Sequence, residues 1–236
     1  MTDAEPIFRV AVIPTRDRHA MLFDAVNSLA SQVDQVIIVD NYSDPRIDRD
    51  NWGMVEWWDE DLVTVLRHNE DPPNISRLWN LGLITAESMA REDGHEKWDV
   101  AVINSDVVVP HLWVQRLSAA MRATTAVLAY PDQSGYTSGS ILHKVAEPVP
   151  LSQRITGYAH MMRGEAGLRY DESMAWWYSD DDMDWTARQR GGALLVPGLS
   201  VEHRDPNGST NARVELQEQA GRDRQTFINK WGRAPH

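Results

Sequence analysis

Residues 35–41 read Gln35-Val36-Ile37-Ile38-Val39-Asp40-Asn41, a short apolar run that ends in a carboxylate and an amide. A continuous run of β-branched residues of this length is typical of a strand buried on both faces, as in parallel sheets covered by helices. Similar runs occupy residues 7–13, 62–67 and 100–103. These four runs predict the strands of a buried, mostly parallel sheet.

Helical periodicity separates these runs at residues 17–32, 75–90 and 110–121. In the first of these segments Leu22, Val26 and Leu29 share one face. Thr15 or Asp17 is a candidate N-cap for the same helix. Alternating strands and helices indicate βαβ units, so the sequence predicts the α/β class, with a mostly parallel central sheet flanked by helices.

The alternation changes after Tyr130. There we expect a loop-rich connection at 131–139, strands at 155–162, 193–196 and 199–203, and helices at 179–190 and from about 211 to 230. Neither an internal repeat nor a long linker interrupts the sequence. Residues 1–236 are therefore predicted to form one domain, with a first half at 1–125, a second half at 126–210 and a C-terminal helix at 211–236.

Charge and composition argue against several classes of protein. With 23 basic and 35 acidic side chains the formal net charge is −12, which argues against tight, non-specific nucleic-acid binding. The absence of cysteine excludes disulfides, thiolate metal ligands and a cysteine nucleophile. No apolar run approaches the ~18 residues of a membrane span, and residues 1–6 lack the basic and apolar regions of a secretory signal. These features predict a soluble, cytoplasmic protein.

Polar residues follow three of the predicted strands, as Pro14-Thr15-Arg16, Asp40-Asn41 and Asn104-Ser105-Asp106. In open α/β sheets the ligand crevice lies at the carboxyl ends of the strands, so we expect these segments to line one site. Asp40 would accept hydrogen bonds from a ribose or a base edge, and Asp106 would hold a divalent cation against a diphosphate. Taken singly, each segment is also consistent with a strand-to-loop turn.

Asp180-Asp181-Asp182-Met183-Asp184 places four carboxylates at the predicted start of a helix. The helix dipole favours acidic residues there, so a solvated, well-capped helix start is one interpretation. The other is a general base, because burial and neighbouring carboxylates raise a carboxyl pKa toward neutrality. These side chains point in different directions on a helix, so one or two of them at most would face a pocket.

The interpretation of Trp176-Trp177 and of His203 depends on their neighbours. The two indole rings would either form the floor of a sugar site or fill the core. His203 ends a predicted strand, and it would be a metal ligand only if Asp106 held a metal beside it.

Together these segments resemble the glycosyltransferase family 2 group, whose fold is GT-A. The resemblance covers nearly the whole chain, and the order and spacing of the motifs carry it rather than any single motif. The matching segments are Ile13-Pro14-Thr15-Arg16-Asp17-Arg18, residues 36–45, Ser76-Arg77-Leu78-Trp79-Asn80-Leu81-Gly82-Leu83, Asn104-Ser105-Asp106, Asp181-Asp182-Met183-Asp184-Trp185, Arg188, Gly191-Gly192, Val196-Pro197, His203 and Phe227-Ile228-Asn229-Lys230-Trp231-Gly232.

The resemblance implies a transferase that moves a sugar from a nucleotide sugar to an acceptor hydroxyl with inversion. The first half would bind the donor, and the second half would bind the acceptor and carry catalysis. A UDP-sugar is the commonest donor in the family. The acceptor stays open between a small molecule, a polysaccharide and a modified nucleobase in DNA.

The resemblance also implies a role for each candidate residue. Asp182 would be the general base, with Asp181 beside it, and Trp176 and Trp177 would contact the acceptor. A Mn²⁺ or Mg²⁺ ion would be held by Asp106, His203 and Asn104. The implied donor-binding residues are Pro14, Thr15, Arg16, Asp40, Asn80, Ser105 and Asp106.

Two positions depart from the family pattern. Asn104 stands where the metal-binding motif has its first Asp, and Asp181 stands where a Glu precedes the base. An amide oxygen brings no charge to a metal, so we expect weaker metal affinity, and a metal-independent enzyme is the alternative.

Two other functions compete with the transferase. A catalytically inactive nucleotide- or sugar-binding module would also explain Asn104. A nucleotidyltransferase shares the sheet and the acidic site, but it would begin with a Gly-rich loop, which this sequence lacks after its first predicted strand. Hydrolysis of the donor distinguishes an active transferase from a binding module.

Overall fold

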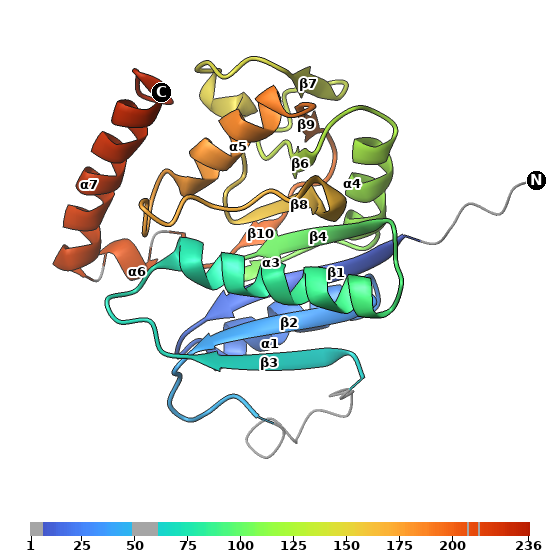
Figure 1. The fold of residues 1–236 in the computed structure, drawn as a ribbon, viewed down its shortest axis with the longest axis vertical. Helices are drawn as coiled ribbons and strands as arrows, with labels where there is room; N and C mark the ends of the chain where they lie inside the picture. The colour runs from blue at the N-terminus through green and yellow to red at the C-terminus, as the bar shows by residue number, and fades with distance from the viewer. Residues whose placement is uncertain (1–6, 49–60, 207, 212) are drawn as a thin grey trace, which may run out of the picture.

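The computed structural model describes residues 7–48, 61–206, 208–211 and 213–236. Its centre is one mixed, mostly parallel sheet with the strand order β3-β2-β1-β4-β8-β6-β9-β7, and helices flank it (Figure 1). The predicted α/β fold class is confirmed.

The first half of the sheet is parallel. Its strands are β3 (Val63–His68), β2 (Gln35–Asn41), β1 (Phe8–Thr15) and β4 (Trp98–Ile103). All six residues of β4 are buried, as are six of the seven in β2, so these strands pack on both faces. This is the arrangement that the continuous apolar runs predict.

The second half of the sheet changes direction. β8 (Ala159–Arg163) lies antiparallel between β4 and β6 (Leu128–Pro131). β9 (Ala193–Val196) then pairs parallel with β6, and β7 (Ile141–His143) closes the edge antiparallel to β9. One sheet therefore runs through both predicted halves of the chain.

Helices cover both faces of the sheet (Figure 1). α1 (His19–Leu29) and α4 (Trp113–Arg122) pack in the apolar core on one face. α3 (Ile75–Glu92) and α5 (Ser179–Gln189) pack in the core on the other face. α3 begins where the sequence predicts, and the Asn74 side chain caps it by accepting a hydrogen bond from the Arg77 N–H at 3.0 Å.

The C-terminal helix lies beside α5 (Figure 1). The predicted helix from about 211 to 230 is α7 (Val214–Trp231), and a separate short α6 (Gly208–Asn211) precedes it. Met174, Trp185 and Phe227 form a third apolar cluster that joins α7 to α5. No helix in the described residues combines the length and the apolar character needed to cross a bilayer.

Short elements complete the chain. β5 (Val107–Val108) pairs antiparallel with β10 (Glu202–His203) in a second, two-stranded sheet. The 3₁₀ turns are η1 (Leu151–Gln153) and η2 (Gly164–Ala166).

Several predicted boundaries are wrong. The strand predicted to end before Pro14 continues to Thr15, where β4 no longer pairs with β1, so Pro14 has one neighbouring strand and not two. The strand predicted at 155–162 begins only at Ala159, and that predicted at 199–203 is reduced to residues 202–203.

Neither predicted N-cap of α1 acts as one. Arg18 is at the N-cap, and it makes no side-chain capping bond. Asp17 instead adopts a left-handed conformation with φ of 55° and joins β1 to the loop after β2. Its N–H donates to Ser43 Oγ at 2.9 Å, and its Oδ1 accepts from the Asp44 N–H at 2.8 Å.

Candidate active site

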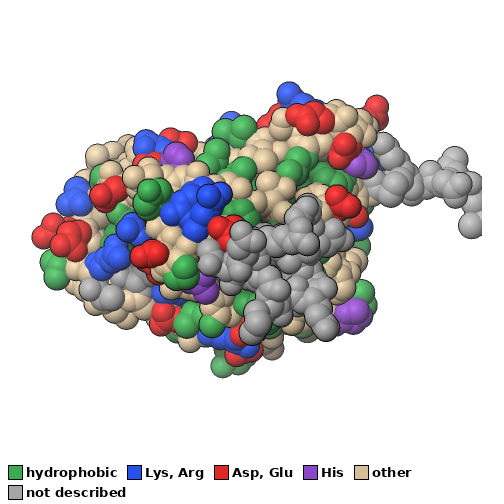
Figure 2. Space-filling view, turned by 90° about the horizontal axis from the view of Figure 1, so that it is seen from below, with side chains coloured by type: hydrophobic (Ala, Val, Ile, Leu, Met, Phe, Trp, Pro, Cys, Tyr) green, Lys and Arg blue, Asp and Glu red, His purple; other side chains and the backbone are tan. Residues whose placement is uncertain are grey.

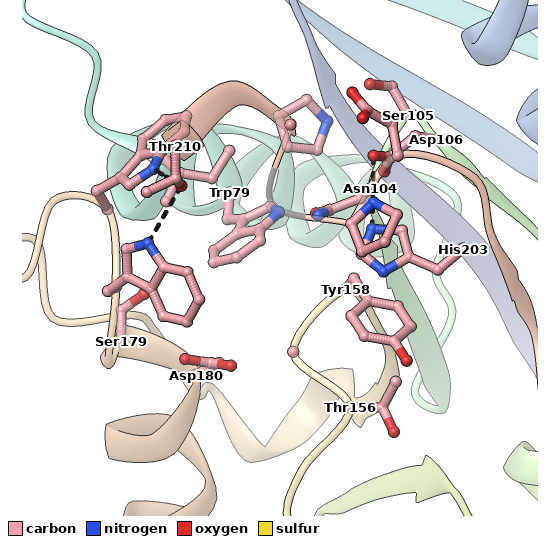
Figure 3. A pocket seen from close by; sticks show the side chains of 18 of the residues that line it. Trp79, Asn104, Ser105, Asp106, Thr156, Tyr158, Ser179, Asp180, His203 and Thr210 are labelled. Atoms are coloured by element: carbon pink, nitrogen blue, oxygen red, sulfur yellow. Dashed lines mark hydrogen bonds and ion pairs between the residues drawn. The ribbon is translucent and has the colours of Figure 1, made fainter. Parts of the chain in front are cut away.

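A pocket of about 1100 Å³ opens at the carboxyl ends of β1 and β4, on the edge that the polar strand ends predict (Figure 3). The segment after β1 contributes Pro14, Thr15 and Arg16, and the turn between β4 and β5 contributes Asn104, Ser105 and Asp106. The opposite wall comes from residues 154–158, the start of α5 and α6. With His203, which also lines the pocket, seven of the predicted donor or metal residues are therefore brought together here.

Three buried polar atoms of side chains that line the pocket have no hydrogen-bond partner among the described residues. They are Thr15 Oγ1, Trp79 Nε1 and Gln133 Nε2, and the Thr15 and Trp79 side chains are only 5% and 6% exposed. Unpaired buried polar atoms are rare in folded proteins, so beside a pocket they are candidate contacts for a ligand's polar atoms. The Trp79 ring is held against Tyr170, with 4.5 Å between ring centroids.

Asp40 and Asn80 do not line the pocket. Asp40 is fully buried, with Oδ1 accepting from the Ser43 N–H at 2.8 Å and Oδ2 from Arg67 Nη1 at 3.3 Å. The Asn80 side chain bonds the backbone of Tyr170: its Nδ2 donates to the Tyr170 carbonyl and its Oδ1 accepts from the Tyr170 N–H, at 2.9 Å each. Asp40 and Asn80 are each the chain neighbour of a residue that does line the pocket, Asn41 and Trp79 respectively.

A charged cluster forms one side of the pocket. Asp106 Oδ2 accepts from Arg18 Nη1 at 2.7 Å and lies 3.4 Å from His203 Nε2. Arg18 Nη2 donates to Asp205 Oδ2, also at 2.7 Å. Burial alone would raise the pKa of Asp106, but the hydrogen bonds and charges of His203 and Arg18 lower it below the usual range. Asp106 is therefore held as a carboxylate by the Arg18 guanidinium and the neighbouring His203 ring.

This cluster does not fit a divalent cation as it is arranged. The Asp106 oxygen that faces His203 already accepts from the Arg18 guanidinium, and Asn104 brings no charge. Among the described residues, no group of three or more His, Asp or Glu side chains is placed to hold a metal ion. The three predicted ligands Asn104, Asp106 and His203 do lie in the same pocket, however.

Asp180 faces the cavity from the first turn of α5, across from Asp106 and His203 (Figure 3). Burial and the charge of Asp181 raise its pKa from 3.8 to about 7, against the opposing charge of Arg154. Its carboxylate packs on Gly157, where a Cβ would lie 1.9 Å from Asp180 Oδ2. A carboxyl group with this pKa can take a proton near neutral pH.

The predicted bases Asp181 and Asp182 do not line the pocket. Asp181 is paired with Arg154, whose Nη2 lies 2.7 Å and 2.8 Å from its two oxygens. Asp182 faces α7, where Trp231 Nε1 donates to Oδ1 at 2.7 Å and Lys230 Nζ donates to Oδ2 at 3.0 Å. Both carboxylates are thus used in packing α5 against its neighbours.

Trp176 and Trp177 line the pocket and contact Thr210 of α6. Their indole N–H groups both donate to Thr210 Oγ1, at 2.8 Å and 3.3 Å. From α7, the buried Asp223 carboxylate accepts the backbone N–H groups of Ala175, Trp176 and Trp177 at 3.1, 2.8 and 2.8 Å. The aromatic wall is therefore fixed from both C-terminal helices.

Sequence reasoning missed several residues of the pocket. Arg18 and Trp79 stood inside the resembling segments, but no role was assigned to them. The acidic run at 180–184 pointed to a base, yet the sequence did not show which side chain faces the pocket, because four of its five positions are acidic. Tyr158, which stacks on His203 with 4.0 Å between ring centroids, and Thr210 gave no signal at all.

No protein-family model matches the sequence, and no curated protein is similar to it in sequence. Solved structures are similar in fold. Residues 1–349 of TarS from S. aureus align with a TM-score of 0.56 and 13% identity over 93% of this chain and 69% of that one. The same part of TarS in complex with UDP-GlcNAc aligns with a TM-score of 0.55 and 14% identity, over 94% of this chain and 67% of that one.

GalNAc-T7, solved with UDP, GalNAc and Mn²⁺, aligns with a TM-score of 0.61 and 14% identity over 86% of this chain. The present chain spans only 44% of GalNAc-T7 and 42% of a longer TarS structure. At these identities the likeness shows the fold, which is that of the GT-A glycosyltransferases.

Proposed function

We propose that this chain, whose fold is that of the GT-A glycosyltransferases, moves a sugar from a nucleoside diphosphate sugar to an acceptor hydroxyl. The observation that carries the proposal is Asp180, a carboxylate with a pKa of about 7 in a pocket at the carboxyl edge of this sheet. The structural neighbours are solved with UDP, with UDP-GlcNAc and with UDP, GalNAc and Mn²⁺, so a UDP-sugar is the donor that we propose first.

In the proposed reaction Asp180, not Asp182, takes the proton from the acceptor hydroxyl. The acceptor oxygen then bonds to the anomeric carbon as the bond from that carbon to the diphosphate oxygen breaks. The nucleoside diphosphate leaves, and the sugar is transferred with inversion because the acceptor attacks opposite the leaving group. General-base assistance of this kind contributes a factor of about 10² to 10⁴ in rate.

The donor would lie against the strand ends. Pro14, Thr15 and Arg16 with Trp79 would contact the nucleotide, and Asn104, Ser105 and Asp106 would lie beside the diphosphate. The negative charge on the departing diphosphate must be balanced by a cation. Arg18, which pairs with Asp106 in the pocket, supplies a guanidinium cation on this side. Asp40 and Asn80 would support this edge from behind.

The acceptor would lie on the Trp176–Trp177 side. Indole faces pack well on the apolar faces of sugars and other rings. On the face seen in Figure 2, acidic and basic side chains of the described residues are interspersed and form no basic stripe. Together with a net charge of −12, this favours a saccharide or a small molecule over DNA as the acceptor.

Donor binding and donor hydrolysis test the proposal. We expect UDP or a UDP-sugar to raise the melting temperature of the wild-type protein and of the Asp180→Asn variant alike. Slow release of sugar to water should fall by about 10²-fold or more in Asp180→Asn and change little in the matched variant Asp182→Asn.

Two outcomes would contradict the proposal. If no nucleoside diphosphate or nucleotide sugar stabilises the protein, the pocket is not a donor site. If wild-type protein binds a donor but neither hydrolyses it nor transfers its sugar to any hydroxyl compound, the chain is a binding module.

A further inference from the structure

Arg18 pairs with Asp106, one of the residues that the family resemblance implies as a metal ligand. The two carboxylates that converge on Arg18, Asp106 and Asp205, each accept from a separate nitrogen of its guanidinium at 2.7 Å. Arg18 is 21% exposed at the side chain and Asp106 is 5% exposed, so the Arg18–Asp106 pair is partly removed from water, whereas Asp205 is 39% exposed. Charge-assisted hydrogen bonds of this length are among the strong polar contacts of proteins.

We propose that the Arg18 guanidinium replaces the divalent cation, so that this chain binds the diphosphate of its donor without a metal ion. The identity of the ligand, a donor diphosphate, rests on the proposed transfer reaction. The placement of Arg18 between Asp106 and Asp205 does not depend on it. Guanidinium is always charged, and its planar set of N–H donors matches phosphate oxygens. Asp106 and Asp205 then act as positioning residues that hold Arg18 at the pocket wall.

The residues around Arg18 support the replacement. Asn104 lacks the charge that a carboxylate ligand would bring to a metal. His203 also faces the same oxygen of Asp106, at 3.4 Å, and Tyr158 stacks on the His203 ring. A metal ion bound between Asp106 Oδ2 and Asp205 Oδ2 would have to displace the guanidinium and break both of these charge-assisted hydrogen bonds.

The same geometry predicts what happens when Arg18 is removed. Asp106, Asp205 and His203 would then face one another without a cation between them. Carboxylate and imidazole ligands of this kind suit Mn²⁺. A variant without the guanidinium should therefore acquire the metal affinity that the wild-type protein lacks.

The test compares wild-type protein with Arg18→Met and with Arg204→Met. Arg204 is a matched control, because it too joins two carboxylates, Asp24 and Glu202, but outside the pocket. Mn²⁺ binding to the protein alone is measured by electron paramagnetic resonance. We expect Arg18→Met to bind Mn²⁺ about 10-fold or more tightly than the other two proteins, the change that one carboxylate-pair site provides.

UDP is then titrated by calorimetry, in EDTA and in Mn²⁺. Wild-type affinity should be the same in both. In EDTA, Arg18→Met should bind UDP about 10- to 100-fold more weakly, as expected for the loss of a hydrogen bond between charged groups. Mn²⁺ should restore part of that affinity in Arg18→Met only. Arg18→Lys, which keeps the charge but not the fork, should fall between the two.

The outcomes separate this inference from the proposed function. Tight Mn²⁺ binding by wild-type protein that is lost in Asp106→Asn, or no gain of Mn²⁺ affinity in a folded Arg18→Met or Arg18→Gln, overturns the role of Arg18. Both measurements are made without nucleotide. If neither UDP nor any other nucleoside diphosphate binds, the donor site is wrong, and the Mn²⁺ comparison still decides the place of Arg18.

Discussion

Asp180 and Asp182 are two positions apart on α5, and that spacing turns their side chains about 200° away from each other. Asp180 consequently faces the pocket, while Asp182 reaches Lys230 and Trp231 on α7. The acidic run predicted a base in this helix turn. It could not say which carboxylate, because the partners that engage Asp181 and Asp182 come from distant parts of the chain.

The raised pKa of Asp180 predicts a pH dependence of turnover. The base works only when it is deprotonated, so kcat should rise with pH through about 7 and then level off. Initial rates of donor hydrolysis from pH 5 to 9 measure this. In Asp180→Asn the rate should be low and should no longer rise with pH through about 7. Asp182→Asn should keep the wild-type midpoint. A midpoint near 7 that survives in Asp180→Asn would assign the titration to another group.

The metal prediction shows a second limit at the residue scale. Asn104 was readable from the sequence as a weakened ligand, and Asp106 and His203 were readable as candidates. The role of Arg18 could not be predicted, because nothing in its local sequence indicates that it contacts Asp205, which lies 187 positions away.

At the scale of elements, local pattern predicted those that are long or continuously apolar. β2, β4 and α3 follow from runs and spacing within a few residues. β6 and β7 were not predicted, since they have four and three residues and depend on pairing with β9. Pairing with a distant strand also explains why the strand predicted at 199–203 has only two residues, since only these two pair with β5.

α7 positions the aromatic wall through Asp223. Replacing this carboxylate by Ala leaves three backbone N–H groups, those of residues 175–177, without their acceptor. We expect Asp223→Ala to raise the hydrogen-exchange rates of these amides about 10-fold or more, while the affinity for UDP stays unchanged. Mass spectrometry of peptides covering the segment measures the exchange. Glu218→Ala, at an exposed position of the same helix, is the control and should leave the exchange unaltered.

At the scale of the whole molecule, the α/β alternation predicted the parallel half of the sheet and the helices on both faces. It did not predict the change of direction at β8. That strand lies antiparallel between β4 and β6, which are distant in sequence, and no periodicity reports such a neighbour. Residues 155–158, left outside the strand, line the pocket instead.

Gly82 sets the distance between α3 and the sheet. A Cβ at this position would lie 2.2 Å from Val12 Cγ1 on β1, so Gly82→Ala forces the two layers apart or moves Val12. We expect a loss of about 1–3 kcal/mol in the free energy of unfolding, from overpacking that exceeds the helix propensity gained. Urea unfolding measures it.

Gly221 on α7 supplies the matched control, because a Cβ there meets no atom within 4 Å. Gly221→Ala should raise the free energy of unfolding by up to about 1 kcal/mol, which is the helix propensity alone. Equal effects of the two substitutions would contradict the close packing of α3 on β1.

The pairing of β5 with β10 also determines when the pocket is completed in a newly made chain. It joins Val107 to His203, and the Arg204 N–H donates to the Asp106 carbonyl at 2.9 Å. During synthesis the parallel strands β1 to β4 leave the ribosome first, and residues 202–204 leave it much later. During translation the pocket therefore stays incomplete until residues 202–204 have been made and pair with residues 106–108.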